Sequence, residues 1–219
     1  MDTYYTPDAL AEALVGLLPL EPWRGYLEPH VGGGAFARAL RRRMPEAFVY
    51  GIDIDPAAAG LRDCSKAMGG LDFLAADWRH GHPDWIIGNP PYRDAEAHVR
   101  AALGAARVGV AFLLRLAMLE THERAPLWRD YPPRKVWVLQ ERPSFTGSGT
   151  DSCAYGWFWW DREHRGPTEM GWVSWRAPRT RRPVGTTAPR GDVGTEPSAP
   201  VGSVGTDLTV PSAAPGSMG

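Results

Sequence analysis

The 219-residue sequence is poor in cysteine, with only Cys64 and Cys153, which lie far apart and outside any Cys-x-x-Cys pattern. This scarcity excludes a disulfide framework and a zinc site built on cysteine, and it predicts two reduced thiols. Histidine is also scattered, and the His80-x-His82 pair has no companion ligands at metal spacing. We therefore expect no metal ion.

Long apolar runs and an excess of positive charge are missing as well. No stretch reaches the length needed to span a bilayer, and the first ten residues lack the basic start and apolar centre of a signal peptide. A cytoplasmic protein without membrane contact is expected. The formal net charge of -1 gives no global sign of nucleic-acid binding, so any such binding has to come from local arginine clusters.

The sequence has enough apolar residues for one well-cored domain, because its hydrophobic fraction of 43% is that of an ordinary globular protein. From residue 177 onward it is rich in Pro, Gly, Ser, Thr and Ala, with almost no large apolar side chain. Such a segment cannot bury enough surface to offset its chain entropy. We predict a folded domain over residues 1–176 and a disordered tail over residues 177–219.

Short apolar segments alternate with helical segments, as is typical of a parallel sheet covered by helices on both faces. The pattern predicts an α/β fold with a doubly wound, mostly parallel sheet of about seven strands. Ligands bind such sheets beyond the carboxyl ends of the strands, where the strand order reverses. Helices are predicted over residues 7–18, 35–43, 56–66 and 94–107. Strands are predicted over residues 26–28, 47–54, 71–75, 84–88, 108–114, 135–140 and 155–160, and an edge strand over residues 172–175.

A glycine-rich segment, EPHVGGG at residues 28–34, follows the first predicted strand and opens the next helix. Glycine removes the side chains that would keep a ligand away from the backbone. Any tight strand-to-helix turn uses glycine, and a nicotinamide site would share this feature, although the segment departs from G-x-G-x-x-G spacing. The candidate cofactor ligands in it are Glu28, Pro29, Gly32 and Gly34.

Acidic side chains follow the next two predicted strands. Asp53, beside Ile54, ends the second strand, where a carboxylate can accept hydrogen bonds from ribose hydroxyls. Asp55-Pro56 also suits the cap of a following helix. Asp77, beside Trp78, follows the third predicted strand and can accept a hydrogen bond from an adenine amine. This order describes a nucleoside-bearing ligand without a diphosphate, which S-adenosylmethionine fits better than a dinucleotide.

The run Asn89-Pro90-Pro91-Tyr92 ends the fourth predicted strand and is the candidate catalytic centre. Its prolines fix the backbone and remove two amide donors, which leaves the Asn89 side-chain oxygen and the Pro90 carbonyl as acceptors. Two acceptors aimed at the protons of a planar amine favour the pyramidal transition state, in which the lone pair points at the sulfonium methyl. Tyr92 offers a face on which a planar substrate can stack. Taken alone, the run also suits a structural Pro-Pro turn.

The order YYTP, EPHVGGGAF, GIDIDP, AADW and NPPY resembles the amino-methyltransferases, and specifically the small phage and bacterial DNA N6-adenine methyltransferases. The later segments FLLRL, RPSFTG, TDS and YGWF support the narrower match, and the resemblance covers residues 3–160. It implies a class I S-adenosylmethionine-dependent methyltransferase fold and transfer of a methyl group to the N6 amine of adenine in DNA.

The resemblance also implies roles for residues outside the central motifs. Tyr5, Thr6 and Pro7 would close over the cofactor from the N-terminal side. Phe145 would face Tyr92 across an adenine that is flipped out of the duplex or single-stranded. The loop that carries Phe145 otherwise reads as a glycine-rich hairpin connection. The other substrate-binding residues implied by the match are Arg142, Ser144, Thr150 and Asp151.

Alternative functions remain open at this level. Asn-Pro-Pro-Tyr also occurs in methyltransferases that act on a protein glutamine amide and in some that act on an RNA base amine. The front YYTP and the RPSF-to-TDS segment favour DNA. A module that binds the cofactor without catalysis is a further alternative, against which the intact Asn89-to-Tyr92 run argues. The residues expected to recognise DNA lie in segments 124–134 and 144–152.

Overall fold

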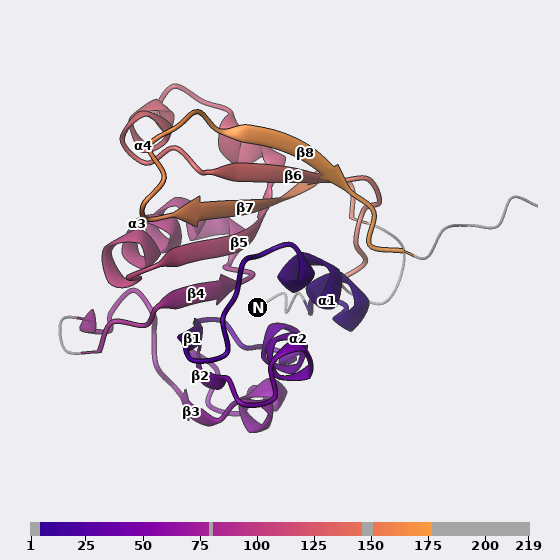
Figure 1. Cartoon of the computed structure of the whole chain (residues 1–219), viewed down its shortest axis with the longest axis vertical. Helices are drawn as coiled ribbons and strands as arrows, with labels where there is room; N and C mark the ends of the chain where they lie inside the picture. The colour runs from indigo at the N-terminus through magenta and orange to yellow at the C-terminus, as the bar shows by residue number, and fades with distance from the viewer. Residues whose placement is uncertain (1–4, 79–80, 146–150, 177–219) are drawn as a thin grey trace, which may run out of the picture. The chain divides into compact units, whose positions relative to one another are not determined.

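The computed structural model describes residues 5–78, 81–145 and 151–176. Within them, helices are interspersed with strands as far as β6, after which β7 and β8 follow without a helix (Figure 1). The α-helices are α1 (Asp8–Gly16), α2 (Ala35–Arg43), α3 (Ala95–Ala105) and α4 (Ala125–Asp130). The 3-10 helices used below are η1 (Ala59–Asp63), η3 (Tyr92–Asp94) and η4 (Leu116–Leu119).

The described strands form one sheet in the order β3-β2-β1-β4-β5-β7-β6-β8. The strands from β3 to β5 in this order are parallel, β7 is antiparallel to both β5 and β6, and β8 is parallel to β6. The predicted α/β fold with a mostly parallel sheet is confirmed. The strands are β1 (Gly25–Glu28), β2 (Phe48–Asp53), β3 (Lys66–Gly69), β4 (Trp85–Gly88), β5 (Gly109–Arg115), β6 (Lys135–Leu139), β7 (Tyr155–Asp161) and β8 (Glu169–Val173).

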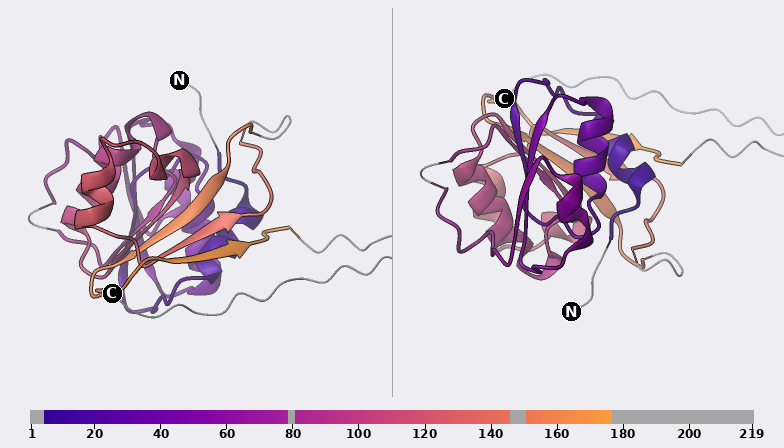
Figure 2. Two further views of the ribbon diagram at one scale, coloured as in Figure 1. Left: turned by 90° about the horizontal axis from the view of Figure 1, so that it is seen from above. Right: turned by 90° about the horizontal axis from the view of Figure 1, so that it is seen from below.

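Helices cover both faces of the sheet, with α1 and α2 on one face and α3 on the other (Figure 2). The alternation of side chains along each strand divides the core accordingly. In β5, Ala111 and Leu113 pack in the cluster that contains α1 and α2, while Val110 and Phe112 pack in the cluster that contains α3. No helix in the described part of the chain combines the length and the apolarity needed to cross a membrane.

The aromatic run of β7 is part of the core on both faces of the sheet. Trp157 stacks on Phe36 of α2, with ring centroids 5.4 Å apart and an interplanar angle of 6°. On the other face, Trp160 stacks on Trp128 of α4 at 6.3 Å. The run therefore packs against helices on both sides and offers no open stacking platform.

Two predicted elements between β2 and β4 are wrong. The third strand is Lys66–Gly69 and not residues 71–75, and the helix expected over residues 56–66 is only the 3-10 helix η1. A strand was predicted over residues 71–75 because the segment contains apolar residues. In the structure Phe73 lies in a turn, where it is buried and its ring packs against Trp78. β3 is a mostly exposed edge strand, so its pairing with β2, and not apolar burial, specifies it.

An eighth strand also exceeds the expected seven. β8 pairs with β6 and overlaps the possible edge strand predicted at residues 172–175 only at Trp172 and Val173. The order of strands reverses between β1 and β4, the neighbours at the centre of the parallel part. In open α/β sheets, ligands bind at such a switch point beyond the carboxyl ends of the strands. The glycine-rich loop follows β1 and the Asn89–Tyr92 turn follows β4, so both candidate motifs lie at this position.

Candidate active site

The glycine loop after β1 adopts backbone conformations that favour glycine. Gly32 has φ +48° and Gly34, which precedes α2, has φ +79°. The loop closes through a hydrogen bond from Gly34 N to the Val31 carbonyl at 2.7 Å. A Cβ at Gly33 would lie 3.0 Å from the Tyr5 ring, so the N-terminal segment lies directly over the loop.

Asp53, at the end of β2, binds the glycine loop directly. Its Oδ2 accepts a hydrogen bond from Gly32 N at 2.7 Å, and its Oδ1 accepts one from Asp55 N at 2.8 Å. Each carboxylate oxygen retains capacity for another donor, such as a hydroxyl. Asp55 has a separate role, since its Oδ1 accepts a hydrogen bond from Ala57 N at 2.9 Å in the turn before η1. The next side chain, Ile54, is 57% exposed at the carboxyl edge of the sheet.

Glu28 is buried at the end of β1, with 1% of its surface exposed. Its Oε2 accepts a hydrogen bond from Ala37 N in the first turn of α2 at 2.8 Å. Burial raises the pKa of the carboxyl well above its usual range, and the hydrogen bonds from the helix amides oppose this shift. Glu28 and Pro29 are therefore buried on the inner side of the loop, whereas Gly32 is partly exposed on its outer side.

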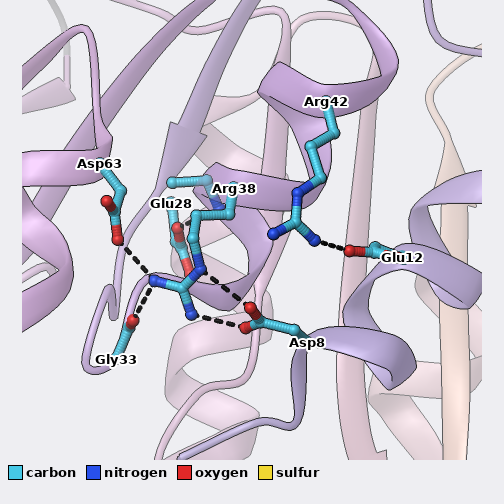
Figure 3. Close-up of polar contacts among 8 residues, drawn as sticks. Asp8, Glu12, Glu28, Gly33, Arg38, Arg42 and Asp63 are labelled. Atoms are coloured by element: carbon cyan, nitrogen blue, oxygen red, sulfur yellow. Dashed lines mark hydrogen bonds and ion pairs between the residues drawn. The ribbon is translucent and has the colours of Figure 1, made fainter.

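Arg38 of α2 links the loop to two neighbouring elements (Figure 3). Its Nη1 donates to the Gly33 carbonyl at 2.6 Å and to Asp63 of η1 at 2.5 Å. Its Nε and Nη2 donate to the two carboxylate oxygens of Asp8 in α1 at 3.1 and 2.5 Å. The bonds to Asp8 and Asp63 raise the pKa of the guanidinium. Beside this network, Arg42 pairs with Glu12.

The backbone of the loop also contacts the backbone of η1. Gly60 N donates to the Gly32 carbonyl at 2.9 Å, and a Cβ at Gly60 would lie 2.2 Å from Gly34 N. No real Cβ fits at that distance, so this contact requires glycine at position 60. The sequence motifs did not single out Gly60, because its partner lies 26 residues earlier in the chain.

In the turn after β4, one end of the Asn89 side-chain amide contacts Thr6 and the other end is buried. Asn89 Nδ2 donates to Thr6 Oγ1 at 3.2 Å. Asn89 Oδ1 is buried and has no hydrogen-bond partner among the described residues. A buried acceptor without a donor is unfavourable, and a substrate amine is a group that can satisfy it. Pro90 is buried, Pro91 is exposed, and Pro7 precedes α1.

Tyr92 and Phe145 lie together, as expected, but their rings contact each other directly. Their centroids are 6.1 Å apart at an interplanar angle of 57°, and Tyr155 packs on both rings at 5.3 and 5.2 Å. Phe145 is 5% exposed. This tilted contact has no room for a base between the rings, so the expected arrangement on either side of an adenine is not the one in this structure.

A polar chain supports this aromatic cluster, and of its three members sequence reasoning had assigned a role only to Asp151. The Arg115 guanidinium lies 4.7 Å above the centre of the Tyr92 ring, and Arg115 Nε donates to Tyr155 Oη at 3.3 Å. Tyr155 Oη in turn donates to Asp151 Oδ2 at 2.7 Å. Burial raises the pKa of Tyr155 to about 12. The sequence signals for Arg115 are its position at the end of the apolar run of β5 and its place in the FLLRL segment of the resemblance.

Asp151 holds the end of its loop. Its N–H donates to the Pro143 carbonyl at 3.1 Å, and its Oδ1 accepts from Cys153 N at 2.9 Å. The hydrogen bond from Cys153 lowers the pKa of the Asp151 carboxyl. Arg142 of the same segment is exposed, Ser144 Oγ is buried without a partner among the described residues, and Thr150 lies outside them.

Asp77 and Trp78 do not follow a strand end directly, because β3 ends at Gly69 and a turn lies between. Trp78 Nε1 donates to the Phe73 carbonyl at 3.2 Å, which fixes the indole against that turn. Asp77 is exposed. The structure therefore places this pair in a loop, and its contact with an adenine remains a prediction.

A histidine pair lies beneath the site, and sequence reasoning missed it. His30 Nε2 and His98 Nδ1 are 2.8 Å apart, with Phe73 and Phe112 packed around them. Burial lowers the pKa of His30 well below its usual range and also lowers that of His98. Within the described residues, no group of three or more His, Cys, Asp or Glu side chains could hold a metal ion.

The sheet order, with β7 antiparallel between β5 and β6, is that of the class I S-adenosylmethionine-dependent methyltransferase fold. Solved structures similar to this chain share it. A modification subunit of a putative type I restriction enzyme from Vibrio vulnificus YJ016 has a TM-score of 0.63 at 15% identity, over 81% of this chain and 48% of its own. The 23S rRNA methyltransferase ErmE has a TM-score of 0.56 at 20% identity, over 74% of this chain and 70% of its own.

Among curated proteins, the chain is similar to the modification methylase CviBIII of Paramecium bursaria Chlorella virus NC1A. The two are 32% identical over 97 residues, which is 41% of this chain and 25% of the methylase. The match thus spans a quarter of the length of that relative. No family model matches the chain.

Proposed function

We propose that this chain is an S-adenosylmethionine-dependent methyltransferase that acts on the exocyclic N6 amine of adenine in DNA. The observation that carries the proposal is the buried Oδ1 of Asn89, an acceptor without a partner among the described residues, at the switch point beside the glycine loop. The similarity to a viral modification methylase supports DNA as the substrate.

The residues at the switch point fit the proposed cofactor. Side chains at Gly32 and Gly33 would lie against the Tyr5 ring, so glycine at both positions leaves the loop backbone accessible beside Tyr5. The partly exposed Asp53 carboxylate, anchored by two backbone amides, is placed to accept hydrogen bonds from ribose hydroxyls. When bound, S-adenosylmethionine supplies an electrophilic methyl group.

The chain's own residues would orient the acceptor amine. Asn89 Oδ1 and the Pro90 carbonyl would accept hydrogen bonds from the two amine N–H groups, which draws the nitrogen lone pair out of conjugation with the ring. Thr6 holds the other end of the Asn89 amide, so the acceptor is already in position before substrate arrives. Such preorganised contacts raise the turnover rate to the extent that they strengthen as the amine becomes pyramidal in the transition state. No titrating base is needed to activate the amine, because its surplus proton leaves to solvent after the nitrogen has taken the methyl group from the sulfonium.

Purified protein with methyl-labelled S-adenosylmethionine, offered unmethylated DNA, RNA and a protein extract in parallel, tests the proposal. We expect label in DNA that digests to N6-methyladenine. Label only in protein would indicate a glutamine amide as the acceptor, and label only in RNA would indicate a base amine there. Either outcome would overturn the DNA assignment, and absence of label from all three substrates would overturn the proposed activity.

A further inference from the structure

A hollow of about 400 Å³ lies beside the proposed catalytic turn. Tyr92 forms part of its wall, together with the first turns of α3 and with Arg124, which lies between η4 and α4. Arg93 and Arg100 also line it. One residue, Tyr92, therefore belongs both to the turn that would hold the target amine and to this hollow.

The hollow has a surplus of positive charge. Its lining contains three arginines against two carboxylates, those of Asp94 and Glu96. Arg100 Nη2 lies 2.9 Å and Arg124 Nε 3.9 Å from the Glu96 carboxylate, so two guanidinium groups share one acid. Arg93 is exposed and makes no ion pair with the described residues. The amino end of α3 adds the partial positive charge of its peptide dipoles.

A second hollow lined by arginines serves as a comparison, because arginines in it stabilise the fold. It measures about 310 Å³ and lies along α2, where Arg38, Arg41, Arg42 and Arg62 line it together with Asp63. Two of the four, Arg38 and Arg42, are engaged by acids of other elements, namely Asp8, Asp63 and Glu12. They hold the fold together, and no residue of the Asn89–Tyr92 turn lines that hollow.

We propose that the hollow beside Tyr92 binds phosphate groups of the polynucleotide strand that carries the target base, through Arg93, Arg100 and Arg124. The inference rests on the proposed function, because it takes the turn as the place where the base enters. A nucleotide brings phosphates attached through its own sugar, so the groups next to a base at Asn89 are anionic. A glutamine side chain in a protein has no such groups. Arginine suits this ligand because its planar fork matches the oxygens of a phosphate.

The test measures binding of the full chain to a fluorescein-labelled single-stranded DNA oligonucleotide by anisotropy, over a series of salt concentrations and without cofactor. In Arg93→Gln and in Arg124→Gln, we expect the slope of log K against log salt to become less negative by about 0.7 for each lost phosphate contact, the value for single strands. Arg93→Lys keeps the charge and should retain the wild-type slope. Arg41→Gln and Arg62→Gln, in the hollow along α2, are matched controls and should also retain it. Thermal unfolding of each variant checks the fold.

An RNA oligonucleotide of the same sequence forms a second arm, because both polymers offer the same phosphate chemistry. A reduced slope in the Gln variants with either polymer supports the inference. Wild-type slopes in both variants with both polymers overturn it, as does equal loss in the control variants. Because no methyl transfer is measured, wild-type protein that binds through these arginines but methylates nothing would overturn the proposed function alone. DNA methylation with unchanged slopes would overturn this inference alone.

Discussion

Asn89 uses only one end of its side-chain amide within the described part of the protein. Nδ2 is bonded to Thr6, whereas Oδ1 is buried without a partner there. A buried oxygen left without a donor costs about 1 to 3 kcal/mol. A substrate amine would supply that donor, so the binding of substrate and the relief of this unfavourable contact coincide.

Substitution of Asn89→Ala should therefore lower kcat on the order of 10²- to 10³-fold, the usual effect of removing one preorganised hydrogen-bonding group from an active site. Binding of S-adenosylmethionine, measured by calorimetry, should change little, because the Asp53 contacts and the glycine loop remain. Thr6→Val removes only the partner of Nδ2 and should reduce kcat less. An Asn89→Ala protein that retains most of its methylation rate would refute the assignment.

The His30–His98 pair is another residue-scale feature with a measurable consequence. Burial lowers the pKa of both rings, while Asp72 and Asp94 oppose the shift at His98. The folded protein therefore keeps the pair neutral at a pH where the unfolded chain, with a histidine pKa of about 6.5, binds protons. The pair contributes stability that is present above about pH 6.5 and is lost as the pH falls toward the lowered pKa values.

Urea unfolding at a series of pH values from neutral to mildly acidic tests this dependence. In His98→Phe, one titrating group is absent, so the free energy of unfolding should fall less steeply below about pH 6.5, by at most about 1.4 kcal/mol per pH unit. Glu28, whose raised pKa acts in the opposite direction, is present in both proteins and cancels in the comparison. Identical slopes in wild type and variant would contradict the prediction.

At the scale of elements, the glycine loop is fixed by its neighbours on three sides. Asp8 of α1 binds Arg38 of α2, which in turn donates to the loop carbonyl of Gly33. α2 begins at the end of the loop, and η1 contacts the loop through Gly60. The position of η1 depends on the absence of a side chain at Gly60, because an added Cβ would meet backbone atoms and not a movable side chain. The loop conformation is thus a property of this three-element contact.

Gly60→Ala should separate η1 from the loop and destabilise the fold by about 1 to 3 kcal/mol, the typical effect of overpacking, and it should also weaken cofactor binding. Gly104→Ala is the matched control, since an added Cβ there, near the end of α3, has nothing within 4 Å. Alanine at that helical position should stabilise the protein by about 0.5 to 1 kcal/mol. Calorimetric unfolding of both variants checks the contrast, and equal effects would disprove it.

At the scale of the whole molecule, the chain divides into two units after Pro178, and every described residue lies in the first. The prediction of a disordered tail over residues 177–219 concerns residues that the structure does not describe. Its basis is composition, because the segment has almost no large apolar side chain with which to dock.

A chain that ends at Pro178 should therefore unfold at the same temperature as the full chain in differential scanning calorimetry. A stabilising contribution of 1 kcal/mol from the tail would shift the midpoint by about 2 to 4 °C for a domain of this size. A decrease of that extent on truncation would contradict the prediction. The same pair of proteins, compared for methylation of DNA, tests whether the tail takes part in the reaction.

The sequence by itself determined the features that follow from local pattern. The alternation of apolar strands with helices predicted the α/β sheet, and α2 begins and ends where expected, because its apolar and arginine positions repeat with the helical period. The Asn89–Tyr92 turn was predictable because two prolines after a buried strand leave the backbone few conformations. β3 was missed because an exposed edge strand carries almost no apolar pattern.

Only the tertiary structure decided which distant residues meet at the switch point. It brought Thr6 to Asn89, Gly60 to the glycine loop, and His98 to His30, contacts that no spacing along the chain encodes. It also showed direct contact between the rings of Tyr92 and Phe145, whereas the sequence resemblance implied a gap for a base between them. These contacts depend on how helices and strands pack in three dimensions, whereas local patterns report only which face of each element is buried.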